Sequence, residues 1–297
     1  MQTKSQIEQL LLSAGVRPNK RFGQHFLIDL NLMRLLVDTA NAGEEDVVLE
    51  VGCGTGSLTE AIAEQAGFCI AVEVDEILAD IARTQLADKS NVEIIVVDVL
   101  ENKFAISPIV IDAMNRARAT YKGRLILVSN LPYVAATPLM LNLITGTTTV
   151  DAMYVTVQKE VADRMTAHPG VKDYGILSIL LAVTGEVRHI RTLRPSVFWP
   201  QPQVDSAMIS FVRRKDKIGR IYNMELFSEV VNLFMQHRRK MVKGCVKFTA
   251  GKLSEIDNWS EIFERCRIDP RNRPEQLRPE DFIAISNLCN ERLASKS

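Results

Sequence analysis

The sequence has no excess of charge of either sign, because 36 Lys and Arg residues balance 36 Asp and Glu residues. Bulk charge therefore indicates no nucleic-acid partner, and evidence for one has to come from local clusters of cations. The five cysteines form no C-x-x-C pair, and the four histidines are scattered along the chain. This pattern argues against a structural zinc site and against a disulfide framework, so we expect no metal.

Long apolar runs are also absent. No run reaches the length of a membrane-spanning helix, and the first residues show neither an apolar signal core nor an Arg-rich transit pattern. We therefore expect a cytoplasmic protein that does not bind membranes. A chain of 297 residues can form one large domain and one small one.

Short apolar runs alternate with amphipathic segments through the first two thirds of the chain. The expected strands are 47–51, 69–74, 92–97, 125–128, 152–157 and 204–212, and the expected helices are 5–16, 30–40, 77–86, 137–145, 159–166 and 174–183. This alternation predicts an α/β fold with a doubly wound parallel sheet, closed by strand 204–212. Residues 101–123 form a loosely patterned crossover.

A basic linker at 213–217 separates this part from a purely helical remainder. Apolar stripes at Leu226, Val230, Leu233 and Phe234, and again near Phe282, have helical spacing. We therefore predict two domains, an α/β domain at 1–212 and a small all-α domain at 213–297.

The glycines of Gly52-x-Gly54-x-Gly56 lie between a strand and a helix, and Ser57 or Thr59 is expected to cap that helix. A serine at position 57 breaks the G-x-G-x-x-G fingerprint of dinucleotide-binding folds. Glu73 and Asp98 end the next two strands, where they could bind a ribose and an adenine amino group. The combination favours S-adenosylmethionine as cofactor over a dehydrogenase site or a tight turn with exposed carboxylates. Glu50 could orient the amino-acid end or satisfy loop amides.

The stretch Asn130-Leu131-Pro132-Tyr133 follows the apolar strand 125–128. Pro132 stiffens the turn, so the Asn130 side chain and the Leu131 carbonyl could act as two acceptors beside the flat Tyr133 ring. Phe198, in a proline-rich loop, could form the opposite wall. These residues fit the amino group of a flipped-out adenine, with Asn130, Leu131, Pro132, Tyr133 and Phe198 as catalytic residues. An Asx-type turn with a core tyrosine and a buried Phe198 is the alternative.

Two basic clusters could contact an RNA backbone. Lys20 and Arg21 lie in an N-terminal arm that also holds two phenylalanines, and Arg238, Arg239 and Lys240 follow a predicted helix. Phosphate contacts supply most of the affinity in protein–RNA complexes. A solvated basic surface is the alternative interpretation of both clusters.

Several of these motifs occur together with others in a fixed order. They are Lys20-Arg21-Phe22-Gly23-Gln24-His25-Phe26-Leu27, Glu50-Val51-Gly52-Cys53-Gly54-Thr55-Gly56, Asn130-Leu131-Pro132-Tyr133, Gln158-Lys159-Glu160-Val161, Tyr174-Gly175, Val197-Phe198-x-Pro200-x-Pro202-x-Val204-Asp205-Ser206 and Arg238-Arg239-Lys240. From about residue 17 onward the chain resembles the ribosomal small-subunit RNA adenine dimethyltransferases.

The resemblance implies a Rossmann-like fold and S-adenosylmethionine-dependent formation of N6,N6-dimethyladenosine. Its target would be two neighbouring adenines near the 3′ end of small-subunit rRNA, in a pre-30S particle, and we expect the enzyme to act as a monomer. The donor-binding positions implied by the resemblance are His25, Leu27, Gly52, Glu73, Asp98 and Asn130. His25 replaces the asparagine usual in the family, and Val134-Ala135-Ala136-Thr137 departs from the usual sequence after the turn.

Other functions fit part of this pattern. A related class methylates an adenine of large-subunit rRNA and confers antibiotic resistance. A non-catalytic RNA-binding relative, a DNA adenine methyltransferase and a small-molecule methyltransferase are further alternatives. Intact Gly52, Glu73, Asp98 and Asn130 favour an active enzyme, and the basic helical domain favours an RNA substrate.

Overall fold

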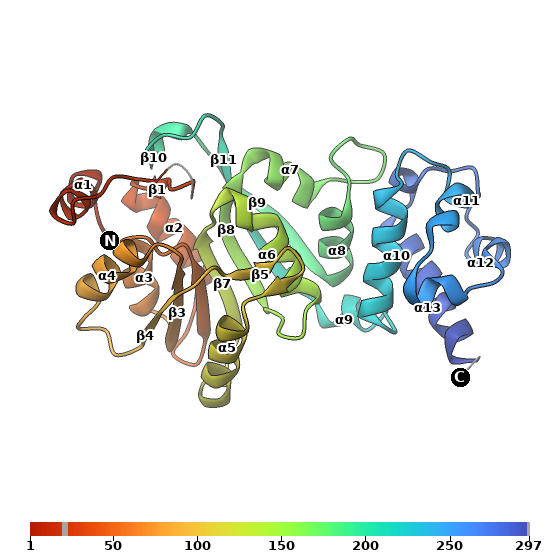
Figure 1. Cartoon of the computed structure of the whole chain (residues 1–297), viewed down its shortest axis with the longest axis horizontal. Helices are drawn as coiled ribbons and strands as arrows, with labels where there is room; N and C mark the ends of the chain where they lie inside the picture. Colours follow the sequence, from red (N-terminus) through yellow and green to blue (C-terminus); the bar gives the residue numbers. More distant parts are fainter. Residues whose placement is uncertain (20–22, 296–297) are drawn as a thin grey trace. The chain divides into compact units, whose positions relative to one another are not determined.

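The computed structural model describes residues 1–19 and 23–295 (Figure 1). Lys20 and Arg21, two of the predicted RNA contacts, lie outside the described residues. Among the helices in these two ranges, none has both the length and the apolar character that crossing a membrane requires.

A seven-stranded sheet forms the centre of the N-terminal part, in the order β4-β3-β2-β7-β8-β11-β9. Its strands are β2 (Val47–Val51), β3 (Phe68–Glu73), β4 (Val92–Val96), β7 (Leu125–Asn130), β8 (Ala152–Gln158), β9 (Gly185–Leu193) and β11 (Ser206–Arg213). The five strands from β4 to β8 are parallel, whereas β11 runs antiparallel to β8. All residues of β2 are buried, as expected for a parallel strand covered on both faces.

The predicted α/β, Rossmann-like architecture is thus confirmed, with one correction at the edge of the sheet. The strand at β11 does not close the sheet, because β9 lies outside it. Sequence reasoning missed β9, in which only Gly185 and Leu193 are buried, so that the strand has no clear apolar alternation.

Helices surround the sheet, and two pairs of short strands lie outside it. They are α1 (Lys4–Ser13), α2 (Leu30–Ala40), α3 (Ser57–Ala63), α4 (Glu76–Gln85), α5 (Pro108–Thr120), α6 (Tyr133–Thr145) and α7 (Lys159–Thr166), with β1 (Phe26–Leu27) paired to β10 (Phe198–Trp199), β5 (Leu100–Asn102) paired to β6 (Ala105–Ile106), and the short helix η2 (Pro195–Val197). Helix α5 contacts β2 and β3, and α2 contacts β7 and β8. Helix α6 begins at Tyr133, earlier than the predicted start at residue 137, because Pro132 serves as its N-cap.

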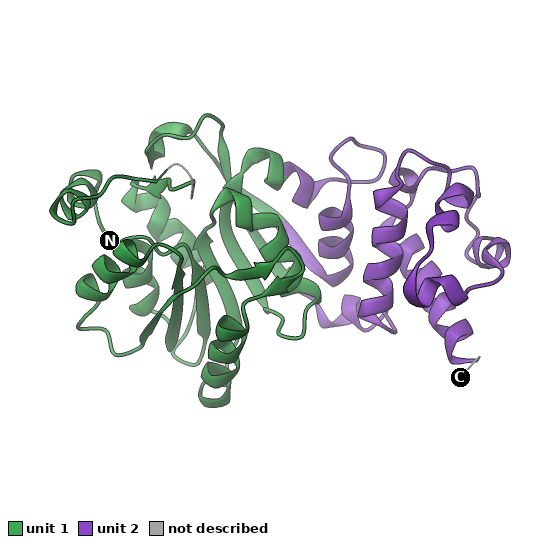
Figure 2. Cartoon of the chain, in the orientation of Figure 1, with its two compact units in different colours: residues 1–162, 188–212 green, residues 163–187, 213–297 purple. Residues whose placement is uncertain are grey.

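The chain forms two compact units, coloured separately in Figure 2. Unit 1 comprises residues 1–162 and 188–212, and unit 2 comprises 163–187 and 213–297. Unit 2 therefore includes a segment that precedes the predicted boundary at residue 213, and the assignment of the two domains to donor binding and RNA binding stays a prediction.

Unit 2 is helical. Its elements are α8 (Ile176–Thr184), α9 (Lys215–Ile218), α10 (Met224–Gln236), α11 (Val242–Cys245), α12 (Trp259–Arg265) and α13 (Pro279–Ala294), with short 3₁₀ helices η3 (Val246–Phe248), η4 (Gly251–Glu255) and η5 (Pro274–Gln276). The predicted apolar stripes are buried, and α10 packs against α13. Phe234 of α10 makes edge contacts with Trp259, Phe263 and Phe282, which places it at the centre of this core.

Candidate active site

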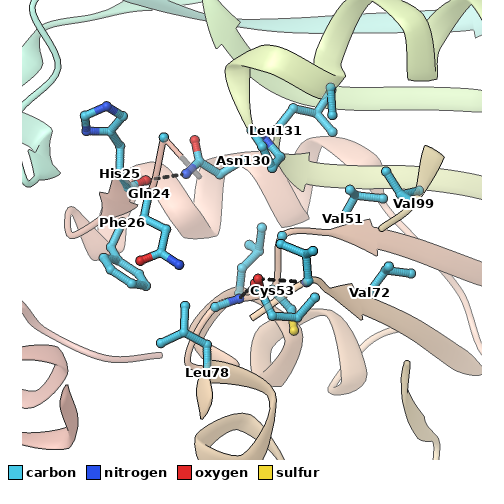
Figure 3. Close-up of a pocket in the computed structure, with 18 of the residues that line it drawn as sticks. Gln24, His25, Phe26, Val51, Cys53, Val72, Leu78, Val99, Asn130 and Leu131 are labelled. Carbon is cyan, nitrogen blue, oxygen red and sulfur yellow. Dashed lines mark hydrogen bonds between the residues drawn. The ribbon is translucent and has the colours of Figure 1, made fainter. Parts of the chain in front are cut away.

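A cavity of about 300 Å³ lies in unit 1 at the carboxyl ends of the parallel strands. Residues 23–27, the loop after β2, the end of β3, the segment after β4, and the end of β7 with its following turn supply most of its walls (Figure 3). In open α/β sheets this edge is the usual place for a ligand. The cavity brings together all six predicted donor-binding residues, namely His25, Leu27, Gly52, Glu73, Asp98 and Asn130.

The glycine loop, residues 52–56, has a backbone that other residues adopt only with strain. Gly52, Gly54 and Gly56 have φ values of 77°, 57° and 83°. A Cβ atom on Gly52 would lie 2.8 Å from Cγ of Pro132, and one on Gly54 would lie 2.9 Å from the Phe26 ring. The loop therefore fits directly against the turn that carries Asn130, and only residues without a side chain allow this approach.

Helix α3 begins directly after this loop, and its N-terminus differs from the prediction. Its N-cap is Gly56, which provides no side-chain hydrogen bond, so the predicted capping by Ser57 or Thr59 is wrong. The Ser57 hydroxyl instead accepts a hydrogen bond from the backbone of Gln2, and Thr59 is fully buried. The positive end of this short helix is thus uncapped by a side chain at the cavity wall.

Glu73 is buried at the end of β3 and holds the glycine loop through its carboxylate. One oxygen accepts the Gly54 N–H at 2.8 Å, and the other accepts the N–H groups of Val74 and Asp75 at 2.9 and 3.0 Å. A carboxylate offers about four acceptor positions, so Oε2 can still accept one hydroxyl group. Burial raises the pKa of Glu73, and the three backbone N–H groups partly oppose this shift.

Two other carboxyl groups, those of Asp98 and Glu50, differ in their exposure. Asp98 is exposed, and its Oδ1 accepts the backbone N–H of Leu100 at 3.0 Å. Glu50 is 2% exposed, and its Oε2 has no hydrogen-bond partner among the described residues. Burial raises the pKa of Glu50 to about 8; the neighbouring Thr59 hydroxyl opposes the shift and the charge of Glu73 adds to it. Because Oε2 has no partner among the described residues, the loop N–H groups do not use all the acceptor positions of the Glu50 carboxylate.

The Asn130 amide is held from both ends. Its Nδ2 donates to the backbone carbonyl of His25 at 2.8 Å, and its Oδ1 accepts from the Thr156 hydroxyl (Figure 3 shows the contact with His25). These two partners define which end of the amide carries the oxygen. The Leu131 carbonyl accepts no hydrogen bond from residues 1–19 or 23–295.

Several sequence motifs that lie far apart in the chain meet around this amide. The His25 ring lies 2.7 Å from the Pro200 carbonyl through Nδ1, and its centroid is 5.5 Å from that of Tyr133. The Tyr133 hydroxyl forms a hydrogen bond of 2.9 Å with the Ser206 hydroxyl. The basic arm, the Asn-Leu-Pro-Tyr turn, the proline-rich loop and the Val-Asp-Ser segment thus form one structural unit.

Phe198 is not in the cavity wall. It is 1% exposed, pairs with Leu27 between β1 and β10, and packs in the main core beside the sheet. The alternative interpretation of Phe198 as a buried core residue therefore describes its position, and the predicted opposite wall for a base is not formed by this side chain. Pro132 and Tyr133 do line the cavity.

The three predicted RNA contacts of unit 2 differ in their partners. Arg238 forms an ion pair with Glu275 at 3.0 Å and donates to the carbonyls of Tyr174 and Lys172 at 3.2 and 3.1 Å. Its guanidinium therefore holds loops of unit 2 together. Arg239 and Lys240 are exposed and form no ion pair with a described residue.

Arg239 and Lys240 line a second cavity, of about 540 Å³, within unit 2. Its wall also contains Lys243, Lys247, Arg273 and the exposed Phe248, whose ring stacks on His237 at 4.0 Å. Sequence reasoning missed Arg273, because it lies far along the chain and no local pattern distinguishes it. The arrangement combines cations that form no ion pair with a described residue and an aromatic ring, over which Lys240 Nζ lies at 5.3 Å, as nucleic-acid surfaces often do.

Known proteins resemble the chain over almost its whole length. The ribosomal small-subunit methyltransferase A of Geobacillus sp. (strain WCH70) is 35% identical over 96% of this chain and 96% of that protein. The protein of the same name from Latilactobacillus sakei subsp. sakei is 33% identical over 96% of this chain and 94% of its own length.

Solved structures share the fold. A dimethyladenosine transferase from Plasmodium falciparum superposes with a TM-score of 0.70 at 20% identity, covering 89% of this chain and 97% of that one. A 23S rRNA methyltransferase gives a TM-score of 0.61 at 20% identity, with 89% and 99% covered. The sequence pattern of the ribosomal RNA adenine dimethylase family matches residues 15–291, and this chain belongs to that family.

Proposed function

We propose that this chain converts two adjacent adenines near the 3′ end of small-subunit rRNA to N6,N6-dimethyladenosine during ribosome biogenesis. The observation that carries the proposal is the Asn130 amide, fixed by His25 and Thr156 beside a carbonyl of Leu131 that has no described donor. We infer that the substrate is a pre-30S particle and that the enzyme acts as a monomer, since one chain supplies both acceptors and the donor cavity. The bacterial origin of the relatives favours action in the cytoplasm.

The chemistry requires a better nucleophile than a free adenine offers. The lone pair of the amino nitrogen is delocalised into the ring, so the group attacks a methyl carbon poorly. Hydrogen bonds from both N–H groups to Asn130 Oδ1 and the Leu131 carbonyl favour a pyramidal nitrogen and stabilise the positive charge that forms there. Oδ1 can accept a second hydrogen bond beside that of Thr156. As the nitrogen takes the methyl group, the bond from that methyl to the donor sulfur breaks. The methylated nitrogen then releases a proton to water, so no general base among the site residues is needed.

S-adenosylmethionine, the methyl source of this family, supplies an electrophilic methyl group. The residues of the cavity fit its parts: Oε2 of Glu73 for a ribose hydroxyl, Asp98 for the adenine amino group, and the glycine loop for the amino-acid end. Gly52 lets the glycine loop pack directly against Pro132, where a side chain would collide with the proline ring. Leu27 and the His25 backbone complete the wall.

The target base has to leave its helix to reach this site. Tyr133 offers a stacking surface, and Phe198 supports the wall from the core as a positioning residue behind Leu27. Arg239 and Lys240 would bind phosphates, with Lys20 and Arg21 of the basic arm as further contacts. Arg238 would contribute indirectly, because its guanidinium holds the backbone at Lys172 and Tyr174.

The test is methyl transfer from labelled S-adenosylmethionine to undermethylated small subunits, large subunits or DNA. We expect N6,N6-dimethyladenosine in small-subunit rRNA alone. Asn130→Ala should abolish transfer while the donor still binds, because the donor contacts of Glu73 and Asp98 remain. Label in large subunits or DNA, or full activity of Asn130→Ala, would contradict the proposal.

A further inference from the structure

The N-terminal segment, residues 2–11, packs on the donor cavity although it precedes all the motifs described above. Ile7 and Leu11 of α1 are 1% and 2% exposed and form an apolar cluster with Leu78 of α4. Phe26 packs against this cluster, and Phe26 is also the ring that lies over Gly54. Ile7 itself lines the cavity. The helix thus reaches the glycine loop through one continuous set of apolar contacts.

Gln2 connects this segment to the loop by hydrogen bonds. Its backbone N–H donates to the Ser57 hydroxyl at 2.6 Å, and its Nε2 donates to the Thr55 carbonyl at 3.1 Å. Its Oε1 accepts the Thr55 hydroxyl at 2.6 Å. Gln2 is 6% exposed and Thr55 is 1% exposed, so these bonds are formed away from water, where an unmatched partner is most unfavourable.

The contacts fall where the loop needs support. Three of its residues are glycines with positive φ, so the isolated loop has many accessible conformations. Glu73 fixes the loop at Gly54 from the sheet side. Gln2 fixes the loop at Thr55 and fixes Ser57, the first residue of α3.

We propose that residues 2–11 are part of the donor site, with Gln2 as a positioning residue that holds the glycine loop and Ile7 as part of the cavity wall. The inference rests on the proposed function, because the ligand whose affinity it concerns is S-adenosylmethionine. The segment prepares the loop before the donor arrives, so its loss should act on donor affinity and leave the transfer step unchanged.

The experiment compares Gln2→Leu with Gln9→Leu in the full chain. Gln9 is an exposed residue of α1, the helix that follows Gln2, and forms no hydrogen bond to the described glycine loop. Binding of S-adenosylhomocysteine is measured by calorimetry, and the donor KM and kcat are measured on small subunits. We expect Gln2→Leu to raise Kd and donor KM about ten-fold with kcat unchanged, and Gln9→Leu to bind as the unaltered chain does.

Thr55→Val removes the hydroxyl that donates to Gln2 Oε1, so it is the second test if Gln2→Leu folds poorly. We expect it to weaken donor binding as well. The double variant should bind no worse than Gln2→Leu alone, since that variant already lacks the hydrogen bond that Thr55→Val removes. A lowered melting temperature with unchanged Kd, or strictly additive effects, would overturn the proposal. If the unaltered chain binds no donor, the proposed function itself fails, and that result is distinct.

Discussion

At the residue scale, the orientation of one amide decides whether the site can work. The Asn130 oxygen accepts from Thr156 and its nitrogen donates to the His25 carbonyl, so a flipped amide would place its oxygen against that carbonyl, which has no proton to donate. Asparagine is the only residue of its size with both a donor and an acceptor in one plane. The chain thus sets the direction of the acceptor before a base enters, which is how a preorganised site gains over water.

Thr156→Val tests this orientation. Valine keeps the shape of the side chain but removes the hydroxyl that donates to Asn130 Oδ1. Loss of about 1 kcal/mol of orienting interaction predicts a kcat about five-fold lower, with donor Kd unchanged. Thr184→Val, which removes a buried hydroxyl bonded to Leu180 in unit 2, is the control. Equal kcat in all three proteins would contradict the role of Thr156.

The family resemblance implies an asparagine at the position of His25, and the structure predicts that histidine is tolerated there. The backbone carbonyl of His25 accepts the hydrogen bond from Asn130, whereas the His25 ring contacts the Pro200 carbonyl. His25→Asn should therefore keep kcat within about five-fold, because the loss of one ring hydrogen bond is worth about 1 kcal/mol or less. Steady-state kinetics on small subunits measures this. A drop beyond ten-fold would assign the ring a direct role.

At the scale of elements, the glycine loop and the Asn-Leu-Pro-Tyr turn act as one piece because Gly52 touches Pro132. Gly52→Ala adds a Cβ 2.8 Å from the proline ring and strains a φ of 77°. We expect it to abolish donor binding and to lower the melting temperature, as measured by calorimetry. Gly170→Ala is the matched control, since its φ is 88° but a Cβ there meets nothing within 4 Å. If both variants behave alike, backbone strain alone explains the effect.

The elements also show how far sequence reasoning reaches. The parallel strands and the positions of Gly52, Glu73, Asp98 and Asn130 could be predicted, because apolar runs and strand ends are local patterns. Strand β9 could not be predicted, because its place in the sheet comes from pairing with β11, which is distant in sequence, and its own residues show no apolar alternation. Whether Phe198 faces a ligand or the core depends on its pairing with Leu27, which is remote in sequence.

At the scale of the whole molecule, two neighbouring arginines have different expected roles: Arg238 stabilises unit 2, and Arg239 binds RNA. Arg238→Ala removes an ion pair and two carbonyl contacts, so it should destabilise unit 2 by about 1–3 kcal/mol in urea unfolding. Arg239→Ala should leave stability unchanged, weaken binding to small subunits, and reduce the salt dependence of that binding by about one phosphate contact. A destabilised Arg239→Ala, or unchanged RNA affinity, would contradict the assignment.

The pH dependence of stability follows from the buried carboxyl of Glu50. Its pKa is about 8 in the folded chain against an ordinary 4.5, so the folded state holds a proton that the unfolded state releases in this range. The contribution to stability is complete below about pH 4.5 and is lost as pH rises through 8. The slope for one proton is about 1.4 kcal/mol per pH unit. The raised pKa of Glu73 acts in the same direction.

Urea unfolding at pH 6.5, 7.5 and 8.5 (roughly spanning the upper part of this range) therefore gives falling stability for the unaltered chain. Glu50→Gln carries no titrating group, so its stability should decline less steeply, whereas Glu101→Gln, at an exposed position in β5, should follow the unaltered chain. Identical slopes in all three would show that Glu50 is ionised in the folded state. Because the donor brings positive charge to this end of the sheet, the same carboxyl should lose its proton on binding, and added donor should flatten the slope as well.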